Sequence, residues 1–170
     1  NAVETVAEAG YGFEVYQENL GAVNVPNFPG ADTSVVGQYT THAPNTIPIL
    51  EFIGNEADAN PQGLTYWWLG INYESPVTTS PSVFQNLKIW HVSRYPVYGY
   101  QGNKVVFDGA QIYGVPAVAD CCNFFWFSDY RNVDTVIRRS TIVNINSIFP
   151  PFNGGGTTVI EDSLVALEWG

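Results

Sequence analysis

Basic residues are scarce in this chain. Six lysine and arginine residues stand against sixteen aspartate and glutamate residues, which gives a net charge of −10. An acidic surface of this kind repels phosphate backbones, so nucleic acid is excluded as a partner. No apolar run reaches the roughly 18 residues that a membrane-spanning helix needs, so the sequence predicts no membrane span.

Cysteine is nearly absent as well. The only two cysteines, Cys121 and Cys122, are adjacent, so they cannot link distant parts of the chain. Two reduced thiols and a strained vicinal disulfide both remain open. With only two histidines besides, the usual zinc ligand set cannot be completed, and we predict no metal centre and no cofactor. Acidic turns leave Ca²⁺ binding open, although the chain has no DxDxDG loop.

What the chain does contain favours β-structure. Aromatic residues make up 15% of it, and it carries 16 glycines and 11 prolines. Glycine or proline interrupts nearly every stretch, and no long stretch shows a clean helical period. This composition is typical of a protein with many short strands and turns.

One strand pattern recurs along the chain. It appears in SVFQNLKIWHV, NKVVFDGAQIYG, DTVIRRSTIVNI and TTVIEDSLVAL, and more weakly in EFIGNEA. An apolar residue begins each copy, a small or apolar residue follows in most of them, and a further apolar residue comes five positions after the first. The first position holds Phe52, Phe84, Phe107, Ile137 and Ile160, and the last holds Ala57, Ile89, Ile112, Ile142 and Val165. The spacing between copies varies, so the extra residues must lie in loops.

An aromatic-rich strand follows each copy, as in GLTYWWLG, YPVYGY, NFFWFSDY and SIFPPF, with GYGFEVY near the start. A unit of this size cannot bury its own apolar row, but stacked units can. We therefore expect an all-β single domain over residues 1–170, a parallel β-helix of about five coils with a long loop at about 17–48. The alternative is an antiparallel β-sandwich or jelly roll, against which the lack of two-residue hairpin turns argues.

Charged residues also repeat in this register. Successive units place Asp108, Arg138 and Glu161 at one position, and Arg139 precedes Asp162 at the next. Lys88 follows Glu56 in the same way. Neighbouring parallel strands lie about 4.8 Å apart, so these opposite charges are predicted to pair on the outside of the stack.

The run FIGNEADANPQGLTYWWLG…FQNLKIWHV…VVFDGAQIYG resembles coils of right-handed parallel β-helix proteins of the pectate-lyase-like superfamily. The resemblance covers most of residues 45–170. It implies a right-handed coil and a secreted or cell-surface protein directed at polysaccharide. The catalytic signature of no single lyase or hydrolase family is present, so no active site carries over from the resemblance.

The ends of the repeat lack the caps that usually close such folds. Bare strand edges need cover, which leads to two expectations. Either the chain is part of a longer β-helix, or its ends stack on other chains in an end-to-end oligomer. The second expectation gives a different function, that of a non-catalytic structural subunit.

Catalysis of either polysaccharide-cleaving type would need particular side chains. A lyase needs a base and a cation, for which Lys88, His91 and Arg94 are the candidates. A glycoside hydrolase needs two carboxylates, and Asp108, Asp120, Asp129 and Asp134 are available, although nothing in their spacing selects a pair. Pairing with neighbouring acids is the simpler role for Lys88, Arg138 and Arg139. Whether the chain is an enzyme therefore stays open.

The aromatic strands offer a better surface for binding. About half of their side chains must face outward, where they would stack on sugar rings or be buried under a partner. The candidates for carbohydrate binding are Trp67, Trp68, Tyr98, Tyr100 and Trp126. The long loop at 17–48 could equally cover them. From these residues we expect polysaccharide or other protein chains as partners.

Overall fold

The computed structural model describes residues 2–4, 11–17, 22–72, 75–76, 80–115, 124–127, 132–149 and 156–167. The chain is all-β, and its three larger sheets are parallel throughout. In the part of the chain that is described, no helix is long and apolar enough to cross a membrane.

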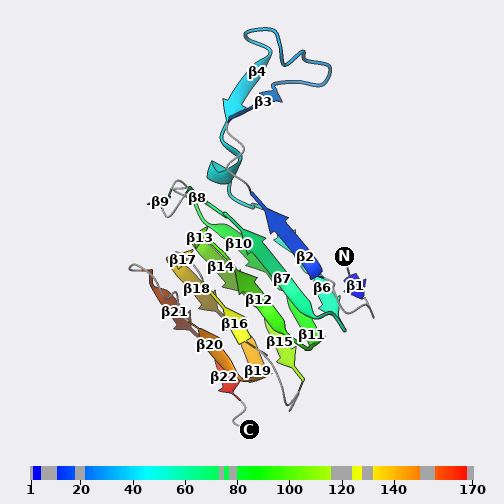
Figure 1. The fold of residues 1–170 in the computed structure, drawn as a ribbon, viewed down its shortest axis with the longest axis vertical. Coiled ribbons are helices and arrows are strands. Elements are labelled where there is room, and N and C mark those ends of the chain that lie inside the picture. The colour runs from blue at the N-terminus through cyan, green and yellow to red at the C-terminus, as the bar shows by residue number, and fades with distance from the viewer. Residues whose placement is uncertain are drawn as a thin grey trace.

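Each of the three sheets collects strands that lie far apart in sequence (Figure 1). The first sheet contains β5 (Phe52–Ile53), β10 (Ser82–Gln85), β14 (Val105–Asp108), β18 (Thr135–Arg138) and β21 (Thr158–Glu161). The second contains β1 (Ala2–Glu4), β6 (Glu56–Asp58), β11 (Lys88–Val92), β15 (Gln111–Gly114), β19 (Thr141–Ile145) and β22 (Leu164–Leu167). The third contains β2 (Tyr11–Tyr16), β7 (Gln62–Trp67), β12 (Tyr95–Gly99), β16 (Phe124–Trp126) and β20 (Ser147–Phe149).

The chain visits these sheets in a fixed order. From β5 it passes to β6 and then β7, and the same sequence of first, second and third sheet repeats from β10, β14 and β18. Each passage pairs in parallel with the one before it. The antiparallel sandwich that the sequence left open is therefore wrong for these three sheets.

The predicted register is confirmed in both columns. Phe84 pairs with Phe52 and Phe107, and the column continues through Ile137 to Ile160. In the second sheet, Ala57, Ile89, Ile112, Ile142 and Val165 are paired in that order. The two columns face the interior, where Phe84 and Phe107 stack with ring centroids 5.4 Å apart.

A sharp corner joins the first sheet to the second in every repeat. Two residues after the column position, the backbone takes a positive φ at Gly54, Asn86, Gly109, Arg139 and Asp162. Glycine adopts this conformation freely and asparagine tolerates it, whereas Arg139 and Asp162 are held there at a cost of about 1 kcal/mol each. The corner is therefore imposed by stacking on the repeats before it and not by local preference alone.

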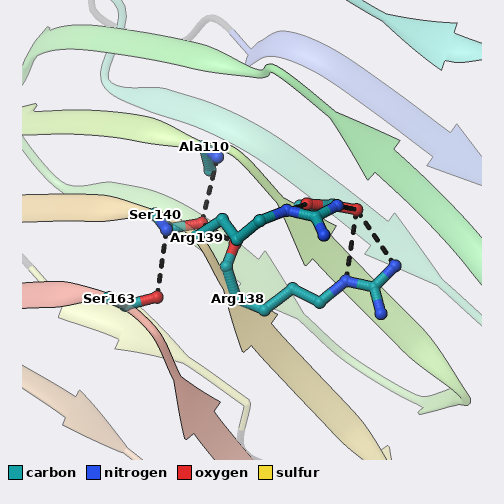
Figure 2. Close-up of polar contacts among 6 residues, drawn as sticks. Ala110, Arg138, Arg139, Ser140 and Ser163 are labelled. Carbon is teal, nitrogen blue, oxygen red and sulfur yellow. Dashed lines mark hydrogen bonds and ion pairs between the residues drawn. The ribbon is translucent and has the colours of Figure 1, made fainter.

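Serine side chains complete the hydrogen bonding at this corner (Figure 2). The backbone N–H of Ala110 donates to Ser140 Oγ at 3.0 Å, and the N–H of Ser140 donates to Ser163 Oγ at 3.0 Å. These serines occupy the row of small residues that the repeat pattern contains. They satisfy backbone donors that point toward the next repeat, which fixes the spacing of the layers.

Three small sheets lie in the connections. β13 (Gly102–Asn103) pairs in parallel with β17 (Asn132–Val133), and β8 (Ile71–Asn72) pairs antiparallel with β9 (Ser75–Pro76). The long loop predicted at 17–48 contains a hairpin of β3 (Val23–Pro26) and β4 (Tyr39–His42), followed by a short 3₁₀ helix, η1 (Pro44–Thr46). Figure 1 shows this hairpin projecting beyond the three sheets.

Candidate functional site

The outer face of the third sheet carries a group of aromatic side chains. On β7, Leu64 and Tyr66 are fully buried in the interior, so Trp67 points outward by the alternation of the strand. Tyr16 on β2 pairs with Trp67 in register. Tyr98 lies on the next strand, β12. Rings from three consecutive layers therefore meet on one surface.

Trp67 lies at the centre of this group. Its ring centroid is 4.6 Å from that of Tyr100, 5.7 Å from that of Tyr98 and 6.4 Å from that of Tyr16. Trp68 joins through Tyr100, with ring centroids 5.9 Å apart. We call Tyr16, Trp67, Trp68, Tyr98 and Tyr100 the aromatic surface. Four of the five were predicted as carbohydrate-binding residues, and the structure brings those four together.

Trp67 also carries a buried donor. Its indole N–H is enclosed and has no hydrogen-bond acceptor among the described residues. Such a group costs about 1–3 kcal/mol when it stays unpaired. The centre of the aromatic surface therefore holds a polar group that the described part of the protein does not satisfy.

The sequence prediction did not include Tyr16, and it did include Trp126. Tyr16 ends the strand GYGFEVY, and its side chain is 52% exposed. Only its register opposite Trp67 shows that it belongs to the group. Trp126 lies on β16 and pairs with Tyr98 in register, which continues the row, but its side chain lies outside the described part of the structure.

The described part of the long loop, residues 22–48, does not fold across this surface (Figure 1). Gln17 Nε2 donates to the carbonyl of Ile47 at 2.8 Å, which draws the two ends of the loop together at the corner of the sheets. Asn45 Nδ2 anchors η1 by donating to the carbonyl of Ile71 at 3.0 Å. From this base, β3 and β4 project away from the third sheet (Figure 1). The sequence left open that the long loop covers the aromatic residues, and β3 and β4 do not cover them.

The three candidate catalytic residues have separate surroundings. His91 Nδ1 lies 2.8 Å from Asp58 Oδ1, and its side chain is 75% exposed. The Arg94 guanidinium carbon lies 5.2 Å from the ring centroid of Tyr95. Lys88 pairs with Glu56 in register but forms no ion pair with a described residue. No contact among the described residues brings these three side chains together around one point.

Glu56 is bound to an aromatic side chain instead of Lys88. Trp90 Nε1 donates to Glu56 Oε1 at 2.7 Å, and the Trp90 ring stacks on Tyr113 of the next layer with centroids 4.5 Å apart. Sequence reasoning did not select Trp90 or Tyr113. A signal was present, because each stands six residues after a member of the buried column, Phe84 or Phe107.

The candidate carboxylate Asp108 is occupied by two arginines. Arg138 donates to Asp108 Oδ2 from Nε at 3.1 Å and from Nη2 at 3.0 Å, and Arg139 Nε donates to Oδ1 at 2.9 Å (Figure 2). Burial raises the pKa of Asp108, but hydrogen bonds from Arg139 and Arg138 and their charges outweigh it, so the pKa lies below its ordinary value. Asp108 is thus an ionised structural group.

The strand register of the charged residues is as predicted, but only some of the predicted ion pairs are formed. Arg138 stands between Asp108 and Glu161 in the strand register, as expected. Among the described residues, however, both Arg138 and Arg139 form their ion pairs with Asp108, on the preceding layer, and not with Glu161 or Asp162.

The remaining candidates give no second site. Asp134 is exposed and accepts a hydrogen bond from Thr157 Oγ1 at 3.1 Å. Asp120, Asp129, Cys121 and Cys122 lie outside the described residues. Within the described residues, no group of three or more histidine, cysteine, aspartate or glutamate side chains is placed to hold a metal ion.

The aromatic surface is therefore the arrangement with the clearest capacity to bind. It presents large, half-exposed rings at different tilts across three layers of parallel strands. In comparisons with protein-family models, with curated proteins and with solved structures, nothing matches this chain.

Proposed function

We propose that this chain is a module of a right-handed parallel β-helix, of the pectate-lyase-like kind, which binds polysaccharide through the aromatic surface. The fold proposal is supported by the fixed order in which the chain visits three parallel sheets and by the unbroken register of their columns. The observation that carries the function is the gathering of three rings, Tyr16, Tyr98 and Tyr100, around Trp67 on the outside of the third sheet.

Rings on the outside of a sheet suit sugars for a physical reason. A pyranose has an apolar face of C–H groups, which gains by leaving water against an aromatic face, and hydroxyls at its edge that keep their hydrogen bonds. Successive layers lie about 4.8 Å apart, so a chain of sugars can cross several rings. Trp67, Trp68, Tyr98 and Tyr100 are partly exposed and Tyr16 is exposed, and contiguous apolar surface that stays accessible is typical of binding sites.

The charge of the protein favours a neutral polysaccharide. A net charge of −10 repels polyuronates. The Arg94 guanidinium contacts the ring of Tyr95, which lies next to Tyr98 but is not itself part of the aromatic surface. Binding without cleavage is the simplest form of the proposal, since Lys88, His91 and Arg94 each have separate surroundings. A secreted or cell-surface location follows from a polysaccharide ligand.

Replacing Trp67 by alanine is expected to weaken binding at the aromatic surface at least tenfold, because it removes the ring that Tyr98 and Tyr100 contact. Native gel electrophoresis in gels containing xyloglucan, galactomannan, hydroxyethylcellulose or polygalacturonate measures this as a loss of retardation. Phe28→Ala is the matched control, because Phe28 is 51% exposed on the connection between β3 and β4. Equal retardation of wild type and Trp67→Ala in every gel would contradict the proposal.

A second candidate function, structural assembly through the ends of the stack, rests on a different observation. Ile160 is 45% exposed and Leu164 is 59% exposed, whereas Ile137, the partner of Ile160 on the preceding layer, is fully buried. β21 and β22 are the outermost strands of the first and second sheets, so their outer edges have no strand partner among the described residues. Such edges attract further strands.

End-to-end association is then expected for the purified chain, and sedimentation velocity measures it. Ile160→Lys should shift the chain toward monomer, because a charge at the exposed apolar column would have to be buried in the contact. Thr157→Lys, an exposed change beside the same strand, is the control. A wild-type chain that sediments as one monomeric species at all concentrations would exclude this candidate.

A further inference from the structure

We infer that the outer face of the second sheet holds a separate position for one sugar ring, beside Tyr113 and above Val143. The inference rests on the proposed polysaccharide ligand but concerns another surface. The aromatic surface lies on β2, β7 and β12, whereas this position lies on β15 and β19. The two can therefore be removed independently.

The stacked pair of Trp90 and Tyr113 defines the position. Their ring planes differ by only 18° and their centroids are 4.5 Å apart, close to the spacing of neighbouring parallel strands. The two rings are thus stacked along the direction in which the layers follow one another. One face of Tyr113 is covered by Trp90, and the other face is directed toward the next layer.

No described residue continues this stack past Tyr113. The residue that pairs with Tyr113 on the next layer is Val143, and Ala166 follows on the layer after that. Both are too short to cover a phenol ring. A flat ring placed over Val143 would lie against the open face of Tyr113 and above an apolar floor.

The described side chains at the neighbouring outward positions of β15, β19 and β22 are uncharged. Gln111 and Thr141 occupy the neighbouring outward positions on β15 and β19, and Leu164 does so on β22 with 59% of its surface exposed. The amide and hydroxyl can exchange hydrogen bonds with sugar hydroxyls, while Leu164 and Val143 offer apolar contact. A ring with one apolar face and polar edges fits this set better than an ion does.

The opposite end of the stack is already occupied. On the far side of Trp90, the paired residue is Asp58, whose carboxylate contacts His91 Nδ1 at 2.8 Å, and Glu56 accepts the indole N–H. A ligand there would have to replace these charged contacts. The hydrogen bond to Glu56 also fixes the orientation of Trp90, so the platform behind Tyr113 is built before a ligand arrives.

Isothermal titration calorimetry with cellohexaose, xylohexaose and mannohexaose tests the position. If the inference holds, Tyr113→Ala and Val143→Trp each remove about half of the binding sites for the hexasaccharide that binds. Tyr113→Ala removes the ring on which the sugar would stack. Val143→Trp places an indole in the space that the sugar would occupy. Val25→Trp is the matched control, because it adds the same indole at an exposed position on β3, outside both surfaces, and it should leave the number of binding sites unchanged.

Trp67→Ala separates this inference from the proposed function. Both hold if Trp67→Ala removes one half of the sites and Tyr113→Ala the other. Binding that is lost only in Trp67→Ala, with full binding in both Tyr113→Ala and Val143→Trp, overturns the inference and leaves the proposed function standing. Binding that is lost only in Tyr113→Ala and Val143→Trp overturns the proposed function of the aromatic surface and leaves the inference standing.

Because Val143→Trp removes no native contact, its result does not depend on whether Tyr113→Ala folds. If no hexasaccharide binds and Val143→Trp instead changes the sedimentation of the chain, the open face of Tyr113 receives a protein side chain and the inference is wrong.

Discussion

Replacing Ile112 by aspartate is expected to destabilise the chain by about 4 kcal/mol or more. Ile112 is fully buried and pairs with Ile89 on one side and Ile142 on the other, in the middle of the interior column of the second sheet. A carboxylate there would lie among apolar side chains with no partner, and burying an unpaired charge is among the most destabilising changes known. Small domains have only about 5–15 kcal/mol in total, so this variant should be largely unfolded in mild urea.

Equilibrium unfolding in urea, followed by tryptophan fluorescence, measures the effect. Gln111→Asp is the matched control, since residue 111 is adjacent in sequence but exposed on the outer face of the same strand. It adds the same charge, and its free energy of unfolding should stay within about 0.5 kcal/mol of the wild-type value. Similar midpoints for both variants would mean that the side chains of β15 do not alternate between interior and surface in the register described.

The interior columns could be predicted because every layer must fill the same interior. Phe84, Phe107 and Ile137 recur at one position of a repeated strand, since whichever residue stands there meets the same neighbours above and below. The variable spacing between copies does not disturb this, because each copy still enters the same sheets in the same register. A pattern of this kind survives in a single sequence, which is why the pairing of strands 30 residues apart could be read from it.

The hairpin could not be predicted for the opposite reason. All four residues of β3 are exposed, so the short alternation of valine and asparagine over residues 23–25 marks no buried face, and three residues are too few to identify a strand. The hairpin is held instead by polar contacts such as Thr41 Oγ1 to Asn24 Oδ1 at 2.8 Å and Thr40 Oγ1 to Asn27 Oδ1 at 2.7 Å. Those partners are 17 and 13 residues apart, and neither pair is a recognised turn motif.

The candidate site was predictable in its residue types and not in its arrangement. The aromatic strands identified Trp67, Tyr98 and Tyr100, but the sequence could not say which rings face outward or that Tyr16 joins them. Trp90 and Tyr113 were not predicted, because the candidates were taken from the aromatic-rich strands and these two residues lie on the other repeated strand. Their stack depends on two layers being adjacent, which only the pairing of β11 with β15 shows.

The charge column shows what register alone leaves undecided. Arg138 has an acidic residue on each side, Asp108 on the preceding layer and Glu161 on the next. The side chain of Asp108 is only 8% exposed, so it would be costly to leave unpaired, whereas Glu161 is exposed and hydrated. The long arginine side chains therefore reach back to the buried carboxylate, and Arg139 joins Arg138 there.

Asp108→Asn is expected to lower the free energy of unfolding by about 2 kcal/mol at pH 7. The amide nitrogen would face guanidinium donors, and at least one of the charge-assisted bonds to Arg138 and Arg139 would be lost. Because the arginine heads are partly exposed, with 39% and 62% of their side chains accessible, water recovers part of the loss. Glu161→Gln, which neutralises the exposed acid on the other side of Arg138, should change stability by less than about 0.5 kcal/mol.

The same variant should change how stability depends on acid. The pKa of Asp108 is lower in the folded chain than its ordinary value, which is about 3.9 in unfolded peptides. Its stabilising contribution is therefore complete above that pH and is lost as the pH falls through the lower folded value, where the carboxylate is protonated. Asp108→Asn has no such proton to take up, so the difference in the free energy of unfolding between wild type and variant should be constant above about pH 5 and should narrow as the pH falls below about 4.

Urea unfolding at a series of pH values measures this gap. A gap that stays the same down to pH 2.5, or one that widens in acid, would show that the two arginines do not hold Asp108 in its ionised form.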